Sequence, residues 1–449
     1  MLVNIHKHKI MLLVTLSALI AGTAQSQVWT LQQCIDTALV HNKSLQISRN
    51  SREVGEQKHK EAQANLIPKV NVNADYRYYA NLPYQFMPLS AFGGPDGQFK
   101  EVQFGVPHNI NANLQLTMSL YNPVVYGAIQ STKIGSEISG LQVQKTAEQL
   151  FFEISNLYYN AQILSSQHAF IDSNLINNKK LLKNMQLLKE QLIVKGTDVS
   201  KIQLQIDQLT NQGEIIANKY EQVLSALKFT MGISGERSIG ISPLLLHHPE
   251  NKEYKNASTI DIRLSETQSR MLVSELMTLK NSRLPSLSLY GTYGITGFGY
   301  DRQPNEFLKF YPIGFAGLQL TYPLFNGTIT QRKINQKKLE VRNSELQQSL
   351  ITEQTNMQID NARRQRMVAQ HSMETTLLQI SLGHSVYGQT ILQQAQGTAG
   401  LPDVLLADNA LREAQQNYLA AVVEYLKADL ELKKLTGNIH WNKDLSTLE

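Results

Sequence analysis

The sequence has a single cysteine, Cys34, among its 449 residues. A disulfide within the chain and a cysteine-based zinc site are therefore both excluded. Proline is scarce, with 13 residues, and glycine reaches only 26, so collagen-like and proline-rich classes do not apply. Beyond the first 26 residues no run of 18 apolar residues occurs, which excludes a bilayer-spanning helix there. The net charge of +5 includes no long basic run, so nucleic acid is not an expected partner.

Residue combinations typical of catalysis are also missing. His247 and His248 are adjacent, but they stand in an expected loop without carboxylates at metal-ligand spacing. The glycines of 291–297 resemble a phosphate-binding loop, yet they lie in a predicted strand with no helix after it. We therefore expect no enzyme, no cofactor and no metal site.

The first 26 residues are typical of a secretory signal peptide. Lys7 and Lys9 give the basic start, and residues 10–21 form a twelve-residue apolar stretch followed by small residues. Cleavage after either Ala24 or Ser26 fits the pattern. A membrane anchor is the alternative, but twelve residues are too few to span a bilayer. The sequence therefore predicts an exported protein.

The chain repeats itself at an offset of 204 residues. The segment Leu114–Thr117 recurs as Leu318–Thr321, and Leu120-Tyr121-Asn122 recurs as Leu324-Phe325-Asn326. Each half reads as helix, strand, loop, strand, very long helix, turn and helix. Because such self-similarity marks a duplicated structural unit, we predict two copies of one elongated unit.

Four segments alternate between apolar and polar residues with the period of a β-strand. They are expected at about 67–80, 110–121, 285–296 and 313–324. Each is long enough to cross a bilayer as a tilted strand, and 20 of the 33 aromatic residues lie in 76–126 and 290–325. A soluble sandwich is the alternative. In lipid, strands must close into a barrel of about eight or more, so one chain's four strands predict a barrel shared by a dimer or a trimer.

The loops after the first and third strands, about 80–109 and 297–312, are expected to be exposed turns on the outer side. Four prolines stand where helix and strand are expected to meet, because proline can neither continue a helix nor donate to a strand ladder. These junction residues are Pro68, Pro123, Pro285 and Pro323.

Residues 124–194 and 327–395 contain no proline and show helical periodicity over a length that requires coiled-coil packing. Apolar residues follow at heptad spacing in the last helix, from Val404 through Leu411 to Leu432, with a companion stripe of small residues that begins at Ala407. A long solid coiled coil is the alternative, although it leaves the four amphipathic strands unexplained.

The expected organisation has five parts. They are a signal peptide at 1–26, a first repeat at 27–233 with a tip turn near 196, an insert at 234–258, a second repeat at 259–437 with a tip turn at 397–402, and a tail at 438–449.

Two stretches resemble the TolC family of outer-membrane efflux proteins. One runs from Trp29 to Leu39 and is followed by Asn42; the other runs from Gly397-Thr398 to Ala407. The likeness covers essentially the whole chain after the signal. It implies a mixed α and β membrane protein, in which a homotrimer forms a twelve-stranded outer-membrane barrel, four strands per chain. A long periplasmic α-helical coiled-coil barrel would continue it, with an equatorial layer from the insert and the tail.

The resemblance also implies a passive exit duct in the outer-membrane lipid, used in efflux or type I secretion. Its partners would be a periplasmic adaptor protein and an inner-membrane transporter, and its cargo stays open. A structural coiled-coil scaffold of the envelope, without transport, is the alternative.

Carried onto this sequence, the family's first acidic aperture position matches Asp403, while the second falls at Leu406, two residues before Asp408. Asp198 lies beside the first tip. The adaptor-docking tips would comprise Gly196, Thr197, Gly397, Thr398 and Gly400. Alternatively, Asp403 is a first-turn acid of a helix and the glycines serve only the turns.

Overall fold

The computed structural model describes residues 27–242, 253–255, 257–299 and 309–439. The expected signal peptide, His247 and His248, most of the expected tail and part of the second loop lie outside the described residues. Chain contacts divide the protein into two units. The first comprises residues 1–50, 141–263 and 349–449, and the second comprises 51–140 and 264–348.

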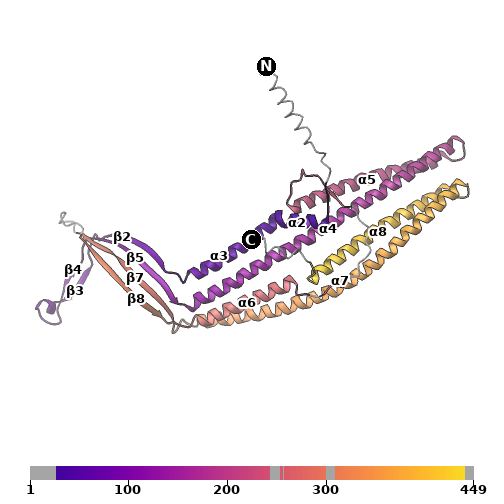
Figure 1. Cartoon of the computed structure of the whole chain (residues 1–449). Helices are drawn as coiled ribbons and strands as arrows, with labels where there is room; N and C mark the ends of the chain where they lie inside the picture. Colours follow the sequence, from indigo (N-terminus) through magenta and orange to yellow (C-terminus); the bar gives the residue numbers. More distant parts are fainter. Residues whose placement is uncertain (1–26, 243–252, 256, 300–308, 440–449) are drawn as a thin grey trace, which may run out of the picture. The chain divides into compact units, whose positions relative to one another are not determined.

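The second unit contains a four-stranded antiparallel sheet (Figure 1). Its strands are β2 (Lys69–Tyr78), β5 (His108–Tyr121), β7 (Ser286–Gly299) and β8 (Lys309–Thr321), in the order β2-β5-β7-β8. Each strand overlaps one of the four segments that alternate in the sequence. The two strands of each repeat pair with each other, and the repeats join through the pairing of β5 with β7.

The register puts the alternating apolar residues of β2, β5 and β7 on one face. The opposite face is mainly polar on these three strands, whereas β8 places Tyr311, Ile313 and Phe315 there. Val72 pairs with Leu114, which pairs with Tyr293 on its other side. One residue along, Asn73 pairs with Asn113, and the Asn73 side-chain amide donates to Gln115 Oε1 at 3.2 Å. Because directly paired residues share a face, the apolar stripe runs unbroken across the sheet.

Seven α-helices accompany these strands among the described residues. They are α2 (Leu31–His41), α3 (Lys43–Ala64), α4 (Pro123–Glu190), α5 (Gly196–Met231), α6 (Ile260–Asn281), α7 (Ile329–Ala395) and α8 (Leu401–Leu435). With 68 and 67 residues, α4 and α7 are each about 100 Å long. None of the described helices has the length and apolarity needed to cross a membrane.

The prolines mark the ends of elements. Pro68 and Pro285 directly precede β2 and β7, and Pro323 follows β8. Pro123 is the first residue of α4, a position where its missing N–H breaks no helical hydrogen bond.

The first unit is a coiled-coil core whose heptad positions are buried as predicted. Val404 and Leu411 of α8 are 0% and 1% exposed, and the companion alanines are buried beside them. In α5, Ile202 and Leu209 occupy the equivalent core stripe. This burial pattern is typical of a coiled-coil interface between neighbouring helices, in which small residues allow the helix axes to approach closely.

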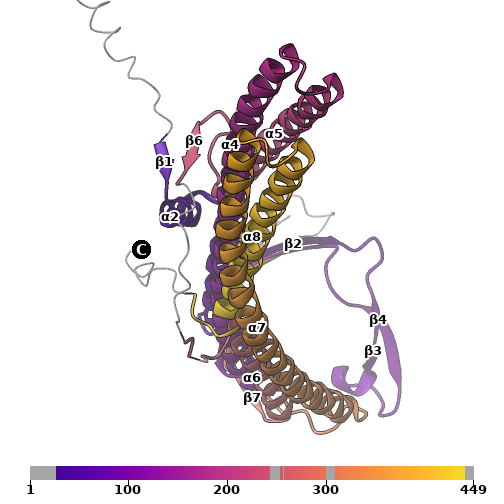
Figure 2. The ribbon, with the colours of Figure 1, turned by 90° about the vertical axis from the view of Figure 1, so that its right-hand side faces the viewer.

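A small parallel sheet in this unit was not expected from the sequence. β1 (Gln27–Trp29) pairs with β6 (Ile239–Ile241), beside α2 (Figure 2). The Tyr158 hydroxyl of α4 donates to the Trp29 carbonyl oxygen at 3.0 Å. Cys34 is fully buried in the cluster beneath, where burial raises the pKa of its thiol to about 12.

The loop after β2 is more ordered than the exposed turns expected there. It holds a hairpin of β3 (Tyr84–Pro88) and β4 (Phe99–Gln103), separated by the short helix η1 (Leu89–Phe92). Its aromatic side chains are exposed, with Phe86 at 67% and Phe99 at 63%.

Candidate functional site

The two turns at the ends of the helical hairpins are built differently. In the α7–α8 turn, Gly397 has φ of +75°, and the next N–H, from Thr398, donates to the Gln393 carbonyl oxygen at 2.9 Å. In the α4–α5 turn the left-handed residue is Leu192, while Gly196 and Thr197 are the first two residues of α5. Only the second turn therefore uses its glycine for a conformation that other residues resist.

Asp403 and Asp198 occupy the first turns of α8 and α5. The Gly400 N–H donates to Asp403 Oδ2 at 2.8 Å, so this carboxylate caps its helix. Asp198 lies 3.5 Å from the Lys201 ammonium. Both are acids at a helix N-terminus, where the helix dipole favours negative charge. Asp403 is also exposed at the tip, which leaves it able to act on solutes there.

Asp408 lies elsewhere, inside the coiled coil and only 2% exposed. Its Oδ2 accepts from Gln205 Nε2 of α5 at 2.5 Å and from Asn178 Nδ2 of α4 at 3.4 Å. Arg412 Nε stands 3.2 Å from the same oxygen. A carboxylate held in this way does not face solvent, which separates Asp408 from the exposed Asp403.

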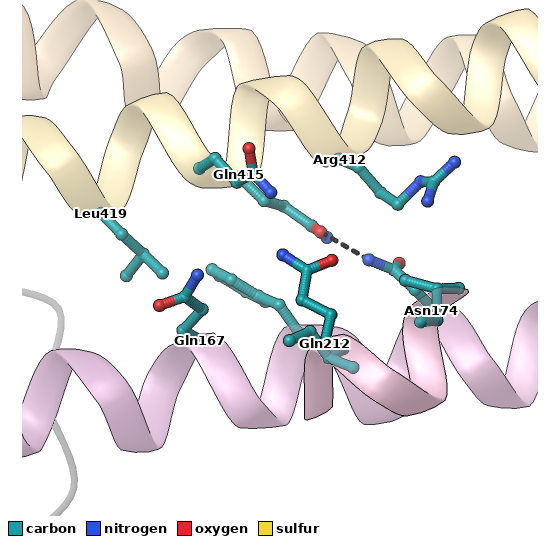
Figure 3. Close-up of a pocket in the computed structure, with 10 residues that line it drawn as sticks. Gln167, Asn174, Gln212, Arg412, Gln415 and Leu419 are labelled. Atoms are coloured by element: carbon teal, nitrogen blue, oxygen red, sulfur yellow. Dashed lines mark hydrogen bonds between the residues drawn. The ribbon is translucent and has the colours of Figure 1, made fainter. Parts of the chain in front are cut away.

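A pocket continues this polar seam along the same three helices (Figure 3). Asn174 of α4 donates to Gln415 Oε1 of α8 at 3.0 Å, with both side chains buried. Gln167 and Gln212 also line the pocket. Amide and charged groups thus join the two helical hairpins at a place where heptad packing alone would put apolar side chains.

The Asp408 carboxyl makes stability in this unit depend on pH. Burial raises its pKa, although Arg412, Asn178 and Gln205 act in the opposite sense. A raised folded-state pKa means that the folded form gains stability as pH falls toward and through that value. We expect the free energy of unfolding of the wild type, relative to Asp408→Asn, to increase as pH is lowered from 7 to the ordinary carboxyl value of about 4. A difference between the two proteins that stays constant over this range would contradict the assignment.

The sheet offers a second functional surface in the other unit. Its apolar face exposes large side chains, such as Val72 at 74% and Leu320 at 69%. The two outer strands, β2 and β8, each pair along one edge only within the described residues. Exposed apolar area joined to open strand edges marks a sheet that is completed by further strands and covered by lipid or protein.

Comparison with known proteins gives a full-length match. No family model matches the chain. The outer membrane protein TolC of Salmonella enteritidis is 21% identical over 453 residues, which cover 94% of this chain and 84% of that protein. TolC of Escherichia coli strain K12 is also 21% identical, with 94% and 85% covered.

Solved structures agree along the whole fold. The outer membrane protein VceC of Vibrio cholerae superposes with a TM-score of 0.73 at 15% identity, covering 91% of this chain and 96% of that one. The CmeC outer membrane channel of Campylobacter jejuni gives a TM-score of 0.70 at 15% identity, with 91% and 85% covered. The chain belongs to the TolC family of outer-membrane efflux channels.

Membership in the TolC family places this chain in the outer membrane, from which it extends into the periplasm. It also makes the protein a transport channel and not an enzyme. The amphipathic sheet is the described region with a continuous exposed apolar face.

One cluster in this TolC-family chain was not found from the sequence. Asp429 of α8 accepts from Arg366 Nε of α7 at 2.7 Å and from the Tyr254 hydroxyl at 2.8 Å, and Lys433 Nζ lies 2.8 Å away. The Arg366 guanidinium also packs against the rings of Tyr254 and Tyr425. The only sequence signal was Asp429 and Lys433 at helical i, i+4 spacing.

The charges in this cluster control the ionisation of its carboxylate. Burial alone would raise the pKa of Asp429, but Lys433, Tyr254 and Arg366 together hold the pKa below its ordinary value. The same cluster fastens residues 253–255 of the predicted insert to the middle of α7 and to the C-terminal end of α8.

Proposed function

We propose that three copies of this chain close one twelve-stranded barrel and form a passive exit duct. The single observation that carries the proposal is the four-stranded sheet, with one apolar face, an opposite face that is polar on β2 and β5, and two open edges. Backbone groups in lipid must all be paired, so β8 of one protomer joins β2 of the next. Asn71, Asn73 and Gln115 then line a watery lumen.

The helical hairpins continue the duct through the periplasm. Their tips, at Gly196-Thr197 and Gly397–Gly400, are the docking surface for a periplasmic adaptor protein, which couples the duct to an inner-membrane transporter. Exposed turns at the ends of long helices support this role, because a partner can reach them without unpacking the coiled coil.

Asp403 and Asp198 form the acidic lining of the periplasmic aperture in this proposal. Three copies of Asp403 around one opening attract cations and repel anions. The capping hydrogen bond from Gly400 fixes the Asp403 carboxylate at the turn and is compatible with that role. An asparagine at 403 can keep the cap through its side-chain oxygen while it removes the charge.

Conductance in planar bilayers tests the function. The purified protein should form pores that prefer cations, and Asp403→Asn should lower the cation-to-anion permeability ratio by about twofold or more. Asp207→Asn, an exposed acid further along α5, is the matched control and should leave the ratio unchanged. Absence of any pore from the purified oligomer would contradict the duct, whereas an unchanged ratio in Asp403→Asn would contradict the aperture assignment alone.

A further inference from the structure

A basic patch lies where the second repeat changes from helix to strand and back. Four exposed cations form it: Lys280 and Arg283 at the end of α6, and Arg332 and Lys333 at the start of α7. The Arg283 guanidinium donates to Gln331 Oε1 at 2.5 Å, which joins the two helix ends. Ser286 pairs with Thr321, so both junctions lie at the same end of the sheet (Figure 1).

The charge of this patch is not neutralised by neighbouring acids. Described residues 276–299 and 309–339 contain no aspartate or glutamate. The nearest carboxylates in sequence are Glu275 and Glu340, and both pair with Lys337, at 2.9 Å and 2.5 Å. Among the described residues, no salt bridge joins any of the four cations of the patch to an acid.

Exposed apolar residues adjoin the patch directly. Leu284 is 46% exposed, Tyr322 57%, and Leu324 and Phe325 are each 84% exposed. These side chains continue the apolar face of the sheet to its helical end. Along the chain, an apolar strand is followed by aromatic and aliphatic residues and then by the four cations. A lipid leaflet has the same order, from acyl chains through the interface to the phosphates.

We propose that this basic patch binds the headgroup phosphates of anionic phospholipids in the periplasmic leaflet. The inference rests on the outer-membrane placement of the chain, because only then does the helical end of the sheet meet that leaflet. Two arginines supply paired N–H donors that suit a phosphate, and two lysines add charge. Unpaired cations beside a membrane-embedded segment attract anionic lipid, and salt weakens the attraction.

The test measures which lipids the full-length oligomer retains. Purified protein is equilibrated in mixed micelles with equal amounts of phosphatidylglycerol and phosphatidylcholine, washed, and its bound lipids are counted by native mass spectrometry. The wild type should retain phosphatidylglycerol in excess, and the excess should disappear near 1 M salt. Replacement of all four cations by glutamine should lower the preference by about tenfold or more.

Two further variants control for the general loss of charge and for the identity of the basic side chains. Glutamine at Lys179, Lys180, Lys183 and Lys189, exposed on α4, removes the same charge far along the sequence from the sheet and should leave the preference intact. Exchange of lysine for arginine and arginine for lysine at the four patch positions keeps the charge and should also retain it. An equal loss in the patch and control variants, or no preference in the wild type, would overturn the inference. If pores still conduct in that case, the channel proposal stands without it.

Discussion

Replacing Arg366 by alanine should lower the free energy of unfolding of the helical unit by about 3 kcal/mol. Breaking one side of a buried ion pair costs about 3–5 kcal/mol, and the lower end applies because Lys433 still pairs with Asp429. The substitution also removes the packing of the guanidinium between Tyr254 and Tyr425. Chemical denaturation followed by helical circular dichroism measures the loss.

Arg364→Ala is the matched control for this prediction, because Arg364 is exposed on the same helix and, within the part of the chain that the structure describes, hydrogen-bonds only to Asn361 one turn away. It should change stability by less than about 0.5 kcal/mol. The Asp429 pKa is lowered in the folded state, so the ion pair's contribution is complete above the ordinary value and is lost as pH falls below about 4. Equal effects of the two substitutions at neutral pH would contradict the role assigned to Arg366.

Replacing Gly232 by alanine should be about as damaging, at roughly 3 kcal/mol. Gly232 ends α5 with φ of +73°, a conformation that disfavours a side chain. A β-carbon there would lie 2.4 Å from the carbonyl oxygen of His41, in the backbone between α2 and α3. Backbone at that distance cannot move aside without breaking the Asn42 contacts to Thr230 and Leu45.

Gly235→Ala provides the comparison three residues later. No atom beyond its neighbours lies within 4 Å of a β-carbon at Gly235, and its φ is not in the positive range. Its stability should stay within about 0.5 kcal/mol of the wild type. A Gly232→Ala protein with wild-type denaturation would show that the α2–α3 break can shift away from α5.

The sequence predicts those parts of the fold in which a strand or helix periodicity of apolar residues repeats many times. The strands follow from runs of alternating residues, and across β2, β5 and β7 the register of the sheet keeps the apolar positions on one face. The long helices follow from heptads such as Val404, Leu411 and Tyr418, all buried. Repeated burial imposes a repeated pattern, and that pattern is visible in one sequence.

The features that were missed depend on single contacts between distant residues. β1 and β6 are three residues each and pair more than 200 positions apart, so neither has a period to detect. Asp408 and Asp429 occupy the position next to the heptad stripe. Asp408, Gln415 and Val422 are buried at this position, and Asp429 is half-buried. Whether such a position faces solvent depends on a further helix, and one helix's heptads do not reveal it.

The candidate site shows the same contrast between local sequence signals and contacts with distant residues. The tip residues could be located from their turn glycines and first-turn acids, because both are local signals. The burial of Asp408 by Asn178 and Gln205 could not, since those partners lie more than 200 residues away.

The mass of the detergent-solubilised protein tests the central claim most directly. A barrel shared between chains predicts one species of three protomers, measured by light scattering coupled to size-exclusion chromatography, because three chains of four strands give twelve. A stable monomer or dimer in mild detergent, with its strands intact by circular dichroism, would contradict the shared barrel and the exit duct built on it.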